Sequence, residues 1–126
     1  MRYAVISDLH ANLEAFEAVL EVIRGRGADQ IVCLGDVVGY NANPNECVDL
    51  VRELEIPTRC GNHDAVACGL EEPWGFNPIA LSAALWTRDH LREDNHRWLK
   101  GLEVNRTFEH FVAAHGSPTD RDCYLF

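Results

Sequence analysis

The chain has 126 residues, of which 47% are hydrophobic and 25% are charged; these values are ordinary for one globular domain and exclude a disordered chain. Twenty acidic residues against eleven basic ones give a formal net charge of -9, which repels polyanions and so disfavours long nucleic acids as partners. The chain has five cysteines without a C-x-x-C pair and a carboxylate as early as Asp8, and both features disfavour secretion. It has no apolar run near the ~18 residues that a membrane span requires, which disfavours membrane insertion. We therefore predict one cytoplasmic domain over residues 1–126.

The first unit of the predicted fold is a strand followed by a helix. Residues 3–7 form a short apolar and β-branched run, which is typical of a strand buried on both faces. From Leu13 the apolar residues recur at helical spacing. Asn12 is in position to cap this helix, and Gly25 and Gly27 are in position to end it.

The same order of strand and helix then repeats. Residues 30–34 indicate a second buried strand, and Asn43, Pro44 and Glu46 provide an N-cap, a first-turn proline and a capping-box glutamate for the next helix. A third, weaker strand is predicted over residues 55–60, since its proline restricts it to a sheet edge or to the start of the pairing. This order predicts an α/β fold with a parallel-sheet core and right-handed crossovers.

Two further helices and one more strand are predicted in the remainder of the chain. A loop over residues 69–76 precedes a helix that Asn77 and Pro78 open, and a shorter helix follows over residues 94–102. Residues 107–114 then have the composition of another strand, which ends directly before a histidine.

Potential metal ligands follow each of the four predicted strands. They are Asp8 and His10, Asp36, Asn62 and His63, and His115. Because the carboxyl ends of parallel strands meet at one edge of a sheet, we expect these side chains to converge on one crevice. Alternation along extended backbone also places Asp8 and His10 on the same side, where both can bind one ion.

The ligand types indicate which metals this crevice suits. Imidazole, carboxylate and amide oxygen suit manganese, iron or zinc, and the lack of thiolates disfavours copper and iron–sulfur clusters. Two such ions about 3.5–4 Å apart can hold the attacking and leaving oxygens of a phosphoryl displacement and lower the pKa of a bound water. A carboxylate between the ions is the natural bridge, and Asp36, in a glycine-flanked turn, is best placed for that role.

Four short segments of the chain together resemble one protein family. They are Asp8-Leu9-His10, Gly35-Asp36 with Gly39-Tyr40, Gly61-Asn62-His63-Asp64 and His115-Gly116. In this order, each after a predicted strand, they resemble the calcineurin-like metallophosphoesterases, specifically the small bacterial and archaeal branch. The resemblance extends from Met1 to about Asp122. It implies an αββα sandwich, of which this chain would hold the first sheet and only the beginning of the second.

The resemblance also implies a division of the ligands between two divalent ions. One ion would be held by Asp8, His10 and Asp36, and the other by Asp36, Asn62 and His115, with a bridging hydroxide as the nucleophile. Manganese is favoured for both positions over iron, zinc, nickel and magnesium.

The family resemblance also implies three catalytic residues. His63 would protonate the leaving oxygen or stabilise charge on the phosphoryl group, and such acid assistance is typically worth about 10²–10⁴-fold. Asp36 and Asn62 complete the expected catalytic set.

The chain departs from the family pattern at two places. No Gly-His-x-His segment follows His115, so both ions are expected to lack ligands, and the apolar end over residues 123–126 indicates the N-terminal part of a complete family domain. Gly39 and Tyr40 stand where protein phosphatases of the superfamily carry an Asp-Arg pair, which disfavours a protein serine/threonine phosphatase. The uncovered sheet face favours a homo-oligomer or a swapped dimer.

The predicted function is metal-dependent hydrolysis of a phosphomonoester or phosphodiester in a small phosphorylated metabolite or nucleotide. The alternatives are a catalytically silent scaffold or interaction module of the same fold, and a nuclease. Three tryptophans, Trp74, Trp86 and Trp98, have rings that can stack on a nucleobase, although packing in the core or at its rim is the more common use of this side chain.

Overall fold

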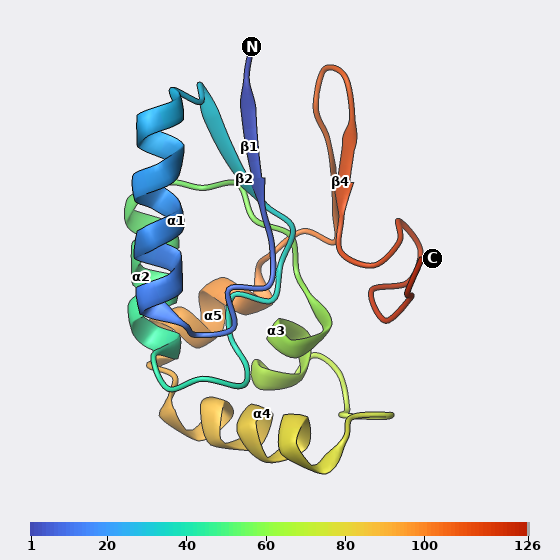
Figure 1. Cartoon of the computed structure of the whole chain (residues 1–126). Helices are drawn as coiled ribbons and strands as arrows, with labels where there is room; N and C mark the ends of the chain where they lie inside the picture. Colours follow the sequence, from blue (N-terminus) through green and yellow to red (C-terminus); the bar gives the residue numbers. More distant parts are fainter. Residues whose placement is uncertain (126) are drawn as a thin grey trace.

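The computed structural model describes residues 1–125, and a parallel pair of strands lies at its centre. β1 (Tyr3–Ile6) pairs with β2 (Gln30–Cys33) in a register that runs from Tyr3 beside Gln30 to Ile6 beside Cys33. Helices α1 (Leu13–Arg26) and α2 (Pro44–Glu53) lie together on one side of this pair (Figure 1). The core between them contains Phe16, Leu20, Cys33, Cys47, Val48 and Val51. The predicted parallel-sheet core is therefore confirmed.

Most of the predicted helix ends are confirmed. The Asn12 side chain accepts a hydrogen bond from the Ala15 N–H at the start of α1, and Gly27 ends this helix in the left-handed conformation with φ 66°. Gly25 does not end the helix but lies inside its last turn. At α2 the prediction of a side-chain cap is wrong, because Asn43 makes no capping hydrogen bond, although Pro44 does occupy the first turn.

Three more helices and a hairpin follow. Helix α3 (Asn62–Ala67) is short, α4 (Pro78–His90) starts after a cap in which Asn77 accepts a hydrogen bond from Ala80, and α5 is Glu93–Lys100. Strands β3 (Asn105–Thr107) and β4 (Val112–Ala114) form a second, antiparallel sheet. Figure 1 shows α4 at the opposite end of the molecule from the N-terminus, with the hairpin beside β1. Within residues 1–125 no helix is long and apolar enough to cross a membrane.

The third parallel strand predicted over residues 55–60 is wrong. This segment contributes only isolated bridges, from Thr58 to Cys33 and from Arg59 to Glu103. Pro57 has no N–H to donate, and Glu55 has a positive φ of 51°, so the backbone is extended over too few residues to form a ladder. The segment still holds its place beside β2, because Cys33 donates a hydrogen bond to the Pro57 carbonyl.

The single strand predicted over residues 107–114 is also wrong. The chain reverses there, and the Phe108 N–H donates to the Phe111 carbonyl to close the turn between β3 and β4. The rings of Phe108 and Phe111 stack with centroids 4.7 Å apart, and both contact the edge of Tyr3. Burial of these rings against β1 favours the hairpin over one long strand.

Candidate metal centre

All six of the predicted site residues line one cavity of about 400 Å³. They are Asp8, His10, Asp36, Asn62, His63 and His115. The cavity lies where β1 and β2 end, as the convergence of parallel strands requires. Only two of the four segments follow strands of that sheet, however. Asn62 and His63 start helix α3, and His115 follows β4 of the separate antiparallel sheet.

The loop after β1 is not extended, so the expected alternation does not explain how Asp8 and His10 come together. Asp8, His10 and Ala11 have positive φ values of 58°, 47° and 54°. Their N–H groups donate to the carbonyls of Gly35, Asp36 and Val37 at 2.8–2.9 Å, which ties this loop to the loop after β2. The left-handed turn and these backbone bonds bring the His10 Nε2 within 3.6 Å of the Asp8 Oδ1.

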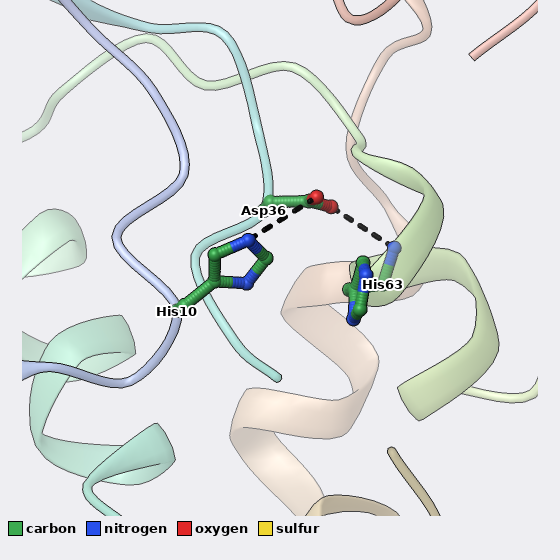
Figure 2. Close-up of side chains that lie close together, drawn as sticks. All are labelled: His10, Asp36 and His63. Atoms are coloured by element: carbon green, nitrogen blue, oxygen red, sulfur yellow. Dashed lines mark hydrogen bonds and ion pairs between the residues drawn. The ribbon is translucent and has the colours of Figure 1, made fainter. Parts of the chain in front are cut away.

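Asp36 is the central carboxylate of the cavity and is almost fully buried. Its Oδ1 accepts a hydrogen bond from the His63 backbone N–H at 2.9 Å, and its Oδ2 lies 3.8 Å from the His10 Nε2 (Figure 2). The same Oδ2 is 3.4 Å from the His115 Nε2. Burial and the nearby Asp64 carboxylate raise the pKa of Asp36 to about 8, so this site favours a compensating positive charge.

Two histidines are held by the protein backbone in the orientation that metal ligands need. The Nδ1 of His10 lies 3.1 Å from the Val38 carbonyl, and the Nδ1 of His115 lies 3.1 Å from the Leu34 carbonyl. Because a carbonyl can only accept, each Nδ1 carries a proton, and the Nε2 of each ring is the atom that can bind a metal ion in the cavity. The His115 Nε2 meets the Asn62 Oδ1 at 3.2 Å. Nitrogen and oxygen lone pairs that face each other in this way suit a shared cation.

The charges of Asp8 and His10 depend on each other. The hydrogen bond with His10 lowers the pKa of Asp8 to about 2, so Asp8 is ionised at neutral pH. Burial of the His10 ring favours its neutral form, but the Asp8 and Asp36 carboxylates outweigh burial and raise the pKa of His10. Without a metal the site therefore favours a proton at His10, and a metal ion would replace that proton.

The ligand atoms fall into two groups that share Asp36. One contains His10, Asp36 and His63, and the other contains Asp8, Asp36 and His115; within each group the atoms lie within 4.8 Å of one another. A residue common to both groups fits the predicted bridging role. The grouping places Asp8 with His115 and adds His63 as a candidate ligand, so the predicted division of ligands between two ions stays a prediction.

His63 lies in a ring of aromatic side chains. Its centroid is 4.8 Å from those of Tyr40 and His10 and 4.6 Å from that of Phe76. Burial, together with the positive charge that His10 and His115 carry when protonated, lowers the pKa of His63 to about 4. Its buried Nδ1 has no hydrogen-bond partner within residues 1–125 and faces Gly39, where a Cβ would lie only 2.7 Å away. Gly39 therefore makes room for this ring, and its φ of 100° also requires glycine.

Asp64 is a residue whose role the sequence analysis missed. It is fully buried, and its carboxylate accepts hydrogen bonds from the N–H groups of Asp36 at 2.8 Å, Val38 at 3.1 Å and Gly61 at 3.0 Å. Burial raises the pKa of Asp64, and these three bonds oppose that shift. The carboxylate thus joins the loop after β2 to the start of α3. An acidic residue three positions after Gly61, at the start of a helix, is the signal that indicates this role.

Arg121 is a second residue in the cavity that no motif indicated. Its guanidinium contacts the Cys60 sulfur at 3.2 Å and the Glu71 carboxylate at 3.4 Å, and the residue lines the same cavity as the predicted ligands. It places a permanent positive charge beside the site.

Comparison with known proteins places this site in a family. The family model for calcineurin-like phosphoesterases matches residues 1–125. The chain is 43% identical over 129 residues to an uncharacterised protein of Methanocaldococcus jannaschii, an alignment that covers 98% of this chain and 53% of that protein. It is similar to the crystal structure of a metallophosphoesterase from Sphaerobacter thermophilus, with a TM-score of 0.80, 39% identity, and coverage of 100% of this chain and 51% of the other.

A third comparison shows the fold alone. The structure of a proposed diadenosine tetraphosphatase aligns with a TM-score of 0.73 and 24% identity, over 92% of this chain and 50% of the other. This chain thus spans about half the length of the relatives that it matches. The alignments confirm the metallophosphoesterase fold with an incomplete sheet. Together with the family match over residues 1–125, they show that the chain belongs to the calcineurin-like phosphoesterase family.

Proposed function

We propose that this chain carries the metal centre of a hydrolase that cleaves a phosphomonoester or phosphodiester in a small metabolite or nucleotide, with two divalent ions, manganese foremost. The observation that carries the proposal is the arrangement around Asp36. Its Oδ2 lies between the Nε2 atoms of His10 and His115, at 3.8 and 3.4 Å, while the opposite nitrogen of each ring is fixed by a backbone carbonyl. Such support of histidine ligands is typical of metal sites.

The side chains have separate tasks in this proposal. When bound, the ions would supply the positive charge that activates water and stabilises the phosphoryl group. Asp36 would bridge the ions, with Asp8, His10, Asn62 and His115 around it. Because the pKa of His63 is lowered to about 4 and its buried Nδ1 has no hydrogen-bond partner among the described residues, its neutral ring would donate a hydrogen bond from Nε2 to the leaving oxygen or to the phosphoryl group.

Metal content and turnover measured on the same sample test the proposal. We expect manganese to support hydrolysis of p-nitrophenyl phosphate or bis(p-nitrophenyl) phosphate by this chain and by its full-length archaeal relative. Chelation should abolish the activity, and added manganese should restore it. Bound metal without turnover in either protein would instead support the silent scaffold, and turnover of DNA alone would support the nuclease.

Substitution of His63 by Asn separates acid assistance from metal binding. If His63 protonates the leaving oxygen, kcat should fall by about 10²–10⁴-fold for an alkyl phosphoester. The loss should be much smaller for a p-nitrophenyl ester, whose leaving group needs no proton. The number of bound metal ions, measured by elemental mass spectrometry, should not change. A lower metal content in the variant would place His63 among the ligands instead.

A further inference from the structure

The three tryptophans have different surroundings, and only one of them lies beside the metal centre. Trp86 of α4 stacks on the ring of His90 with centroids 4.0 Å apart, and Trp98 of α5 packs against the hydrophobic core. Trp74 is 86% exposed and lies in the loop between α3 and α4, which projects from the molecule on the side of the C-terminal segment (Figure 1). Its indole ring is therefore free of core packing and available to stack on a ligand.

Trp74 lines a second cavity that adjoins the metal centre. This cavity has a volume of about 340 Å³, and Tyr40 and Phe76 also contribute aromatic rings to it. It shares five lining residues with the metal cavity: Tyr40, Asn62, His63, Asp122 and Tyr124. The two cavities therefore adjoin each other at these residues.

The position of His63 sets the direction in which a substrate would extend. If His63 gives its proton to the leaving oxygen, the organic group attached to that oxygen must continue on the His63 side, away from Asp36. The aromatic cavity lies on this side, since Tyr40 and Phe76 contact the His63 ring at 4.8 and 4.6 Å. The leaving group would therefore enter the cavity that contains these aromatic rings.

We propose that this second cavity, lined by Tyr40, Trp74 and Phe76, binds the nucleobase of a nucleotide substrate while the phosphate lies at the metal centre. This inference rests on the proposed function. Every nucleobase can stack on an aromatic side chain, so stacking does not depend on which base is present. Asn77 and Asp122 supply the same cavity with an amide donor and a carboxylate acceptor for the polar edge of a base. The net charge of -9 favours a short nucleotide over a nucleic acid.

Calorimetry with AMP and ribose 5-phosphate tests this inference on the manganese-loaded full chain, with each ligand used as its methylene phosphonate, which cannot be hydrolysed. The two ligands share a phosphate group and a ribose, but only AMP carries a base. We expect AMP to bind more tightly. Trp74→Ala should weaken AMP binding by about 5- to 150-fold, as expected for the loss of one base–aromatic stack. Ribose 5-phosphate binding should not change. Trp74→Phe should keep most of the affinity, and Trp86→Ala should behave as the wild type.

The possible results distinguish this inference from the function on which it rests. Equal affinity for AMP and ribose 5-phosphate, or an unchanged affinity for AMP in Trp74→Ala, overturns the nucleobase site. Manganese-dependent hydrolysis of aryl phosphates together with either result would leave the proposed function standing. Conversely, base-dependent binding that requires Trp74, in a protein that hydrolyses no phosphoester, would support the nucleobase site and remove its catalytic purpose.

Discussion

Substitution of Asp36 by Asn is expected to abolish phosphoester hydrolysis, with a fall in kcat of at least about a thousandfold, because the charge that holds the metal ions is worth several kcal/mol. Asn keeps the size of the side chain and can still accept the hydrogen bond from the His63 N–H. The geometry of the cavity should therefore survive. The expected loss of both bound ions, rather than one, is the specific consequence of a bridging ligand.

The same substitution should stabilise the metal-free protein, and the effect should depend on pH. Burial raises the pKa of Asp36 to about 8 in the folded chain, above its unfolded value of 3.8. The contribution of the protonated carboxyl to stability is complete below the unfolded value and is lost as the pH rises through the folded one. The melting temperature of Asp36→Asn should therefore exceed that of the wild type by a growing margin between these two pH values.

Thermal unfolding with a chelator, and titration with manganese, measure the two effects on one pair of proteins. Asp89→Asn is the matched control, since this exposed residue of α4 lies outside the cavity. In the wild type, manganese binding should release protons near neutral pH, because Asp36 and His10 both have raised pKa values. An Asp36→Asn protein that still binds two ions and turns over substrate would contradict the bridging assignment.

Loss of the Asp64 carboxylate is expected to have the largest effect on stability. Asp64→Ala leaves the N–H groups of Asp36, Val38 and Gly61 buried without their acceptor. Each such group costs about 1–3 kcal/mol, so we expect a loss of about 3–5 kcal/mol in the free energy of unfolding after partial relaxation. This is a large part of the stability of a small domain.

Asp64→Asn should have an intermediate effect. Oδ2 accepts from both Asp36 and Gly61, and an amide oxygen can replace it, but the amide nitrogen would then face the Val38 N–H, donor against donor. Urea unfolding gives the stability of both variants, and hydrogen exchange of these three amides shows whether the loss begins there. Slow exchange at all three amides in Asp64→Ala would show that another group satisfies them and that Asp64 does not join the two loops.

The residues that line the candidate site were predictable from the sequence because the chemistry of potential metal ligands is local to short motifs. Asp8, Asp36 and His115 are residue types that bind metals, and each lies directly after a predicted strand. Strand order alone explains why the loops of Asp8 and Asp36 meet at one edge. For His115, the expected strand proved to be half of a hairpin, yet the residue still reaches the cavity.

Features that depend on contacts between distant segments were not predictable. The role of Asp64 depends on N–H groups from two loops, one of them more than twenty residues earlier in the chain. Trp74 and His63 line the same cavity because of how the loop before α4 folds, and hydrophobic periodicity contains no information about that. The short bridge at Thr58 likewise depends on the backbone conformation at Glu55, which is a positive-φ residue without a glycine to mark it.

The turn at Asp8, His10 and Ala11 has a consequence for how the site meets its ions. Residues other than glycine adopt such a conformation at a cost of order 1–3 kcal/mol each, and here the carbonyls of Gly35, Asp36 and Val37 hold them in it. The two loops are thus fixed to each other through main-chain atoms alone. In the proposed metal site, ion binding would therefore require little ordering of the chain, and discrimination between cations would rest on the size and shape of a preformed cavity.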